Sequence, residues 1–124
     1  MTIYENSTVR DYVTKFEETV IEGTVNASDG VFYGCGSLES LTINSGVKII
    51  GNEAFEKCEK LTIIAMEKDV TTIAASAFGG CESITDVYYA SSKNDWNNIN
   101  IGNDNDYLLN ARIHYNYIVS EKKG

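Results

Sequence analysis

The sequence contains no proline, so its turns must be made by glycine, asparagine, aspartate and serine, which are plentiful. It contains three cysteines, and an odd number argues against a closed disulfide framework. Its 18 acidic and 10 basic residues give a formal net charge of −8, without any cluster of lysine and arginine. A nucleic-acid-binding protein needs the opposite sign of charge, so we expect no nucleic-acid partner.

Long hydrophobic runs are also missing. The uninterrupted apolar stretches are only a few residues long, which is too short to cross a bilayer, so we expect no membrane insertion. The first residues lack the basic and apolar regions of a signal peptide. A chain of 124 residues suits a single domain with its own core, and it also suits a piece of a longer secreted protein.

The dominant feature that is present is a threefold repeat. The pattern Phe-x-x-Cys-x-x-(Leu/Ile) begins at Phe32, Phe55 and Phe78, at intervals of 23 residues. A period of this length indicates a solenoid, in which each coil packs only against its neighbours. Alternating apolar residues in each coil predict a short strand, and stacked coils would place these strands in one parallel sheet. The expected inward-facing positions are Leu38, Leu41, Ile43, Leu61, Ile64, Met66, Ile84, Val87 and Tyr89.

Residues 1–23 do not fit the repeat, because a step back of 23 residues from Leu38 and Leu41 lands on Lys15 and Glu18. Apolar residues there recur every three or four positions, which predicts an amphipathic helix that caps the first coil. These residues are Val9, Tyr12, Val13, Phe16, Val20 and Ile21. A helix that binds a partner or a membrane surface is the alternative, but its polar face is acidic, which is wrong for anionic lipid.

We divide the chain into an N-terminal cap (1–23), three repeats (24–90) and a C-terminal cap (91–124). In the C-terminal cap, Ser91 or Ser92 is suited to begin a short helix, and a second short helix or turn is expected at 107–109. A closing strand is predicted over 111–117, with Ile113, Tyr115 and Tyr117 facing inward. A polar tail ends the chain.

The pattern Val-x-x-Ile-(Gly/Ala)-x-x-Ala-Phe-x-x-Cys-x-x-(Leu/Ile), at 47–61 and 70–84, resembles the BspA-like leucine-rich repeat family of bacterial and protist surface proteins. The stretch from Val87 to Trp96, with Ile113 to Asn116, resembles the C-terminal end of such an array. The resemblance implies a leucine-rich-repeat solenoid, α/β in class but mostly β, whose coils of about 23 residues form a parallel sheet of short strands.

The resemblance also implies a function: a non-enzymatic module for protein interaction or adhesion, extracellular or on the cell surface, without a cofactor. We expect a monomer that binds an unidentified protein or glycan, with host extracellular matrix as a candidate. A structural spacer, or a cap that terminates a repeat array, is the alternative. An enzyme is the least supported class, because no nucleophile and base are paired in the sequence.

Three local patterns suggest chemistry. The stacked cysteines Cys35, Cys58 and Cys81 are interpreted as small core residues, with a disulfide or a metal site as alternatives. His114, the single histidine, is interpreted as a surface residue. The segment 103–106 resembles half of a calcium-binding loop but lacks the glycine and distal glutamate, so a solvated loop and helix cap are expected.

The remaining candidate is the outward face of the predicted sheet, where solenoids commonly bind partners. The predicted register of the closing strand would place Arg112 beside Tyr88, and this pair has the character of an interaction hot spot. An ordinary solvated sheet is the alternative. The predicted interaction face consists of Ser40, Thr42, Ile63, Glu67, Asp86, Tyr88, Asn110, Arg112 and His114.

Overall fold

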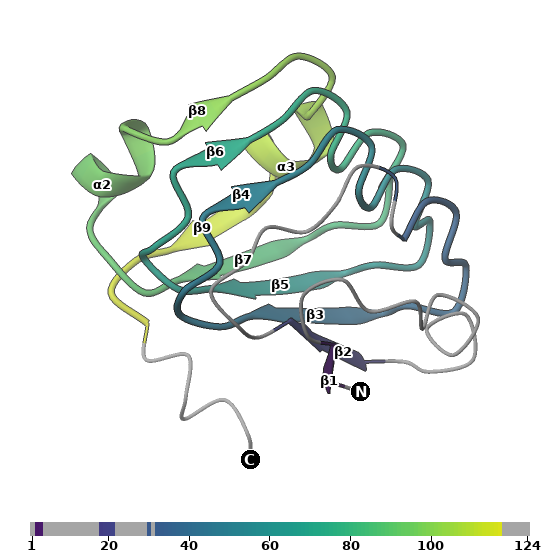
Figure 1. The fold of residues 1–124 in the computed structure, drawn as a ribbon, viewed down its shortest axis with the longest axis horizontal. Helices are drawn as coiled ribbons and strands as arrows, with labels where there is room; N and C mark the ends of the chain where they lie inside the picture. Colours follow the sequence, from purple (N-terminus) through teal and green to yellow (C-terminus); the bar gives the residue numbers. More distant parts are fainter. Residues whose placement is uncertain (1, 4–17, 22–29, 31, 118–124) are drawn as a thin grey trace.

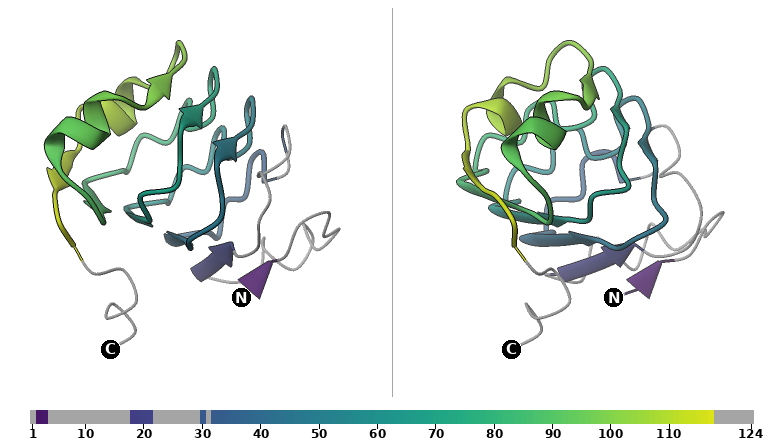
Figure 2. Two further views of the ribbon diagram at one scale, coloured as in Figure 1. Left: turned by 60° about the vertical axis from the view of Figure 1, so that its left-hand side comes forward. Right: turned by 90° about the vertical axis from the view of Figure 1, so that its left-hand side faces the viewer.

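The computed structural model describes residues 2–3, 18–21, 30 and 32–117. The chain winds through successive coils that lie side by side, with one parallel sheet on each of two walls (Figures 1 and 2). The larger sheet has the order β1-β2-β3-β5-β7-β9, and the smaller has the order β4-β6-β8. This arrangement confirms the predicted leucine-rich-repeat solenoid.

The strands are short, as expected for the compact coils of the repeat. The larger sheet contains β1 (Thr2–Ile3), β2 (Glu18–Ile21), β3 (Ser40–Ile43), β5 (Ile63–Met66), β7 (Asp86–Tyr89) and β9 (Arg112–His114). The smaller sheet contains β4 (Ile49–Ile50), β6 (Thr72–Ile73) and β8 (Asn100–Ile101). Two short helices, α2 (Lys93–Asn97) and α3 (Asp106–Leu109), interrupt the last coils.

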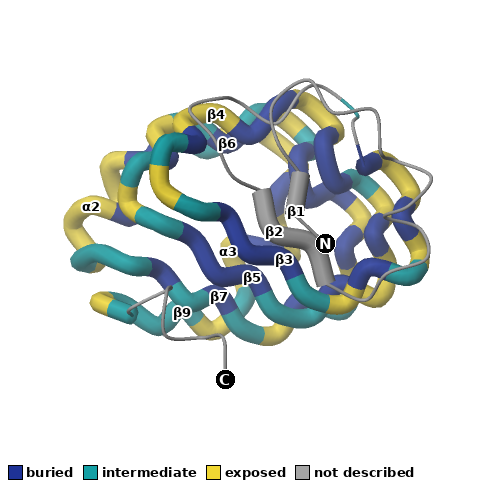
Figure 3. The backbone as a smooth tube through the Cα atoms, turned by 60° about the horizontal axis from the view of Figure 1, so that its bottom comes forward, coloured by how far each residue is buried: buried dark blue, intermediate teal, exposed yellow. Residues whose placement is uncertain are grey.

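The predicted inward-facing residues form the core between the two sheets. Leu41, Ile64 and Val87 occupy one row across the larger sheet and are fully buried. Buried positions repeat from coil to coil (Figure 3), which is the physical reason for the strict period: each apolar residue has equivalents in the neighbouring coils that help to bury it. Each fully buried side chain of this size contributes about 1.5–3 kcal/mol.

Besides the two sheets, the turns that carry phenylalanine and cysteine also stack from coil to coil. The Phe32 and Phe55 rings stack with centroids 5.1 Å apart, and the Phe55 and Phe78 rings with centroids 5.4 Å apart. Backbone hydrogen bonds connect these turns in one direction: the Phe32 N–H donates to the Ala54 carbonyl oxygen at 2.7 Å, and the Phe55 N–H to that of Ala77 at 2.8 Å. Each turn therefore takes its hydrogen-bond acceptor from the following coil.

The N-terminal helix prediction is wrong over Glu18–Ile21, where the chain forms strand β2 and pairs in parallel with β3. Leu41 pairs with Thr19, whereas the regular period would pair it with Glu18. The first coil is therefore shorter than the period by a single position. This explains the error, because the regular period placed charged residues at core positions. The remainder of the predicted helix lies outside the described residues.

The C-terminal cap contains the predicted elements, with one correction. Ser92 is the N-cap of α2, where its hydroxyl accepts a hydrogen bond from the Asp95 N–H at 3.1 Å. The closing strand β9 ends at His114, not at residue 117, and Asn116 has a left-handed φ of 58°. This conformation breaks the strand alternation. The Tyr117 side chain therefore does not face the core as predicted and instead packs against Tyr88.

Asn105 completes the ladder of turn hydrogen bonds at the last coil. Its side chain is 1% exposed, and its Oδ1 accepts from the Phe78 N–H at 2.9 Å, in place of a backbone carbonyl. Its Nδ2 donates to the carbonyl oxygens of Ala74 and Gly102, each at 3.0 Å. Gly102 is required there, because a Cβ at that position would lie 2.7 Å from the Ala75 nitrogen. The prediction of a solvated loop is therefore wrong for Asn105.

Replacing Asn105 with alanine should lower the free energy of unfolding by roughly 3 kcal/mol, because buried N–H and C=O groups lose their partners. Asn105→Asp should also destabilise, because a carboxylate keeps the acceptor but cannot donate to Ala74 and Gly102. Urea unfolding of each variant measures this. Asn103→Ala, at a nearby exposed position, is the control and should change stability by less than about 0.5 kcal/mol. Equal stability of the Asn105 and Asn103 variants would contradict the assigned role.

Two columns of left-handed residues recur in these turns. Gly30, Glu53 and Ser76 have φ of 64°, 60° and 59°, and Gly34, Lys57 and Gly80 have φ of 69°, 61° and 70°. Glycine adopts this conformation without strain, whereas other residues are strained by about 1–2 kcal/mol. Glu53, Ser76 and Lys57 are therefore positions where the repeat has a strained residue and glycine would fit without strain.

Glu53→Gly should stabilise the protein by about 0.5–1 kcal/mol, because the relief of strain exceeds the added chain entropy of glycine in the unfolded state. Gly80→Ala should act in the opposite direction by about 1–2 kcal/mol. Its φ is +70°, and its new Cβ would lie 3.2 Å from Lys57 Cγ. Thermal and urea unfolding measure both changes, and a loss of stability in Glu53→Gly would show that its left-handed conformation is not strained.

Candidate interaction face

The outward face of the larger sheet presents two rows of side chains across β3, β5, β7 and β9. One row runs through Ser40, Ile63, Asp86 and Arg112, and the other through Thr42, Ala65, Tyr88 and His114. Burial alternates along β7 as predicted, whereas in β3 and β5 the residues Thr42 and Ala65, predicted to be exposed on the outward face, are buried. The exposed chemistry of the face is concentrated at the β7–β9 end.

The register of β9 differs from the prediction. Arg112 pairs with Asp86 and His114 pairs with Tyr88, so Arg112 is not the neighbour of Tyr88 in its row. Asn110 is not on the sheet and is instead the exposed C-cap of α3. The additional residues that shift the register lie in the segment that contains α2, β8 and α3, whose length the repeat does not determine.

Asp86 is the electrostatic centre of this end of the face. Its Oδ1 lies 2.9 Å from His114 Nε2 and 3.9 Å from a terminal nitrogen of Arg112. The hydrogen bond with His114 holds the pKa of the Asp86 carboxyl below its ordinary value. The Thr85 hydroxyl and the Arg112 charge lower this pKa further, whereas partial desolvation opposes them. The carboxylate thus stays ionised and orients both side chains of β9.

Aromatic contacts fix the second row. The His114 ring stacks on the Tyr88 ring with centroids 4.4 Å apart and an interplanar angle of 10°. Tyr117 packs against Tyr88 from another side, with centroids 4.7 Å apart. Tyr117 was not predicted to belong to this face, because strict alternation along the closing strand places it on the inward side. Asn116, a residue type that tolerates left-handed φ, was the available signal for a change of side.

The other predicted residues of the face contribute unequally. Ser40 and Ile63 are half-buried in the row of Asp86, whereas Thr42 is 9% exposed and Ala65 is fully buried. Glu67 follows β5 and is half-buried. The structure therefore links four predicted side chains in series: Arg112 and His114 lie beside Asp86, and His114 stacks on Tyr88.

The cysteine column lies in the core, away from this face. Cys35, Cys58 and Cys81 are buried and form no disulfide bond. The Cys58 thiol donates to the Phe32 carbonyl oxygen at 3.2 Å, and the Cys81 thiol to that of Phe55 at 3.0 Å. Contact with Cys35 lowers the pKa of Cys58, but contact with Cys81 and burial outweigh it and raise this pKa to about 12. All three thiols are packed inside the turns, and those of Cys58 and Cys81 bond to the preceding coil.

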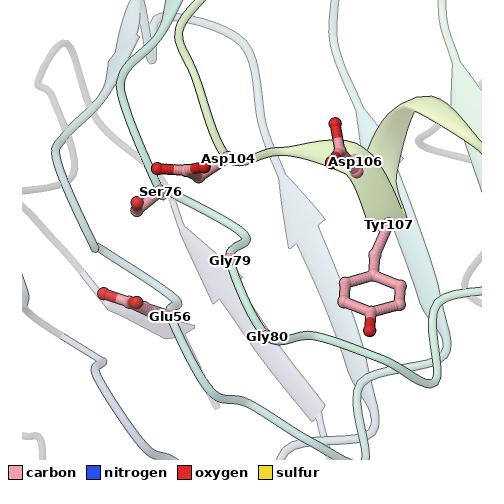
Figure 4. Close-up of a pocket in the computed structure, with 7 residues that line it drawn as sticks. All are labelled: Glu56, Ser76, Gly79, Gly80, Asp104, Asp106 and Tyr107. Carbon is pink, nitrogen blue, oxygen red and sulfur yellow. The ribbon is translucent and has the colours of Figure 1, made fainter.

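A surface pocket of about 260 Å³ lies beside the turns of the last coils (Figure 4). It is lined by Glu56, Ser76, Gly79, Gly80, Asp104, Asp106 and Tyr107. Of its three carboxylates, Asp104 and Asp106 come from one segment and Glu56 from an earlier turn, and they do not point toward one another (Figure 4). Within the part of the chain that the structure describes, no three side chains of histidine, cysteine, aspartate or glutamate are arranged to hold a metal ion. The charged groups that line the pocket are all acidic, and the pocket is open to solvent.

The fold defines the class of protein as a short leucine-rich-repeat solenoid. A family model described as the BspA type leucine rich repeat region, in six copies, matches residues 11–105. The chain therefore belongs to the BspA-type leucine-rich repeat family, a family of repeat modules for protein interaction that are generally not enzymes. The match begins before residue 18, which agrees with a strand at Glu18–Ile21.

No curated protein and no solved structure matches the chain. Among residues 2–3, 18–21, 30 and 32–117, no helix is long and apolar enough to cross a membrane.

His114→Phe should raise the pKa of Asp86, because phenylalanine keeps a ring beside Tyr88 but removes the hydrogen bond to the carboxylate. A lowered pKa stabilises the folded state above the ordinary aspartate pKa of about 3.9, and this stability is lost as pH falls through the folded value. The stability of wild type should therefore fall more steeply on acidification than that of His114→Phe. NMR titration of the Asp86 carboxyl and urea unfolding across this pH range measure both effects. An unchanged Asp86 titration would show that His114 is not the main cause.

Proposed function

We propose that this chain is a non-enzymatic interaction module of a cell-surface or secreted protein, and that it adheres to a partner through the β7–β9 end of its larger sheet. Membership of the BspA-type family supports this, because its proteins are generally surface-exposed or secreted. The partner class is a protein or a glycan, with host extracellular matrix as the first candidate, and the module acts as a monomer.

One observation carries the choice of surface. Asp86, Tyr88, Arg112 and His114 come from two adjacent strands and hold one another in defined positions on the outward face. Rigid aromatic side chains beside an arginine are the residues that most often dominate binding energy at protein interfaces. Because Asp86, Tyr88 and His114 are already ordered by intramolecular contacts, less conformational entropy would be lost when a partner binds them.

A purely structural role, as a spacer or a cap that terminates a repeat array, is the second candidate. The observation in its favour is Asn105, whose side chain substitutes for the backbone acceptor that another coil would provide to Phe78. The two roles differ in their consequences: a terminating cap needs Asn105 but has no need of an exposed arginine on the sheet face.

The proposed function predicts that Arg112→Glu weakens binding to a partner at least about tenfold, because it reverses an exposed charge within the binding face. Wild-type chain and variants would be tested against immobilised extracellular-matrix proteins and cell-wall glycans by biolayer interferometry. Lys93→Glu is the matched control, since it makes the same charge change on an exposed residue of α2.

Circular dichroism and urea unfolding establish that both variants fold. Equal loss of binding in the two variants would assign the effect to net charge and not to this face. Absence of binding to every member of the panel by the wild-type chain would favour the structural role.

A further inference from the structure

The guanidinium of Arg112 is only partly engaged by the rest of the protein. One of its terminal nitrogens lies 3.9 Å from Asp86 Oδ1, beyond hydrogen-bond distance, and its side chain is 78% exposed. The same carboxylate oxygen accepts a hydrogen bond from His114 at 2.9 Å. His114 is thus the hydrogen-bond partner of Asp86. Arg112 is attracted by the charge of the Asp86 carboxylate but donates none of its five N–H groups to it.

The local charge around Arg112 does not oppose an acidic ligand. The chain carries a net charge of −8, so the charge beside Arg112 has to be judged from its neighbours on the sheet. Among the described residues of this sheet, the charged or titratable groups next to Arg112 are Asp86 on the neighbouring strand β7 and His114 on β9 itself, while β5 contributes Ile63 to the same row. Asp86 is 21% exposed, so its charge is partly shielded, whereas Arg112 projects into solvent.

A planar guanidinium with free donors is best suited to a carboxylate, which it can bind through two parallel hydrogen bonds. The aromatic residues decide between a glycan and a protein as the source of this carboxylate. A sugar ring would need an open aromatic face for stacking, but the Tyr88 ring is already covered by His114 and flanked by Tyr117. These packed rings instead form a rigid surface next to the row that contains Arg112. An extended peptide could lie across such a surface.

We infer that the β7–β9 face binds an acidic segment of a protein partner, and that Arg112 contacts an aspartate or glutamate carboxylate of that segment. This inference rests on the proposed function and names the partner class for the same face. Asp86 acts as a positioning residue, because it holds Arg112 near the face without occupying the guanidinium.

The test measures fluorescence anisotropy with the full chain and two labelled twelve-residue peptides, one of alternating glutamate and serine and one with glutamine in place of each glutamate. We expect the glutamate peptide to bind wild type at least about tenfold more tightly than the glutamine peptide. Arg112→Ala should weaken that binding about tenfold or more, and Arg112→Lys should give an intermediate loss, since lysine keeps the charge but not the planar donor set. Lys93→Ala, on α2, is the control and should leave binding unchanged.

Equal binding of the two peptides, or equal binding by wild type and Arg112→Ala, would overturn the inference. If neither peptide binds while the matrix and glycan panel still reports Arg112-dependent binding, the proposed function stands and the acidic-peptide assignment is wrong. If that Arg112-dependent ligand is an acidic glycan, the partner is a glycan and the inference is likewise wrong.

Discussion

The structure depends on the one-way ladder of hydrogen bonds between successive turns. The Phe32 and Phe55 N–H groups each donate to the following coil, so these turns depend on the next coil for part of their backbone hydrogen bonding. The stacked phenylalanine rings and buried cysteines require the same spacing, because a change in coil length would displace both columns at once. Because each acceptor comes from the following coil, the repeat itself provides no acceptor for its last coil. The last donor, Phe78, needs an acceptor from outside the repeat, and the Asn105 amide provides it together with donors for two further carbonyl oxygens.

The sequence predicted the regular part of the fold because one physical requirement, the burial of equivalent apolar residues, determines both the period and the inward-facing positions. Leu41, Ile64 and Val87 could be assigned to the core from spacing alone. The same reasoning failed at the first coil, where a strand replaced a predicted helix because Thr19, and not Glu18, is the partner of Leu41. A short amphipathic segment satisfies helical and strand patterns alike, and only its pairing partner in the sheet distinguishes them.

The candidate site was predicted in its membership but not in its geometry. Asp86, Tyr88, Arg112 and His114 were all assigned to the outward face, yet the longer connection to β9 pairs Arg112 with Asp86 and His114 with Tyr88. No pattern in the sequence specifies this register, because the intervening segment contains two helices and a strand that pack independently of the period. Tyr117 was missed for a related reason: a single left-handed residue reverses the side of the strand to which a side chain points.

These errors and the candidate site share one cause. Where the coils are regular, the outward positions near the centre of the sheet hold small residues such as Thr42 and Ala65, which are buried and offer little to a partner. Asp86 and Tyr88 come from β7, the last strand that keeps the period, whereas their partners Arg112, His114 and Tyr117 come from β9 and the residues that follow it, in the segment that departs from the period. Departure from the repeat removes the constraint that every coil match its neighbour. It therefore permits side chains that the regular coils do not carry at the equivalent positions. The irregular end of the solenoid is the part where sequence reasoning is weakest, and it is also the part that carries the distinctive chemistry of the face.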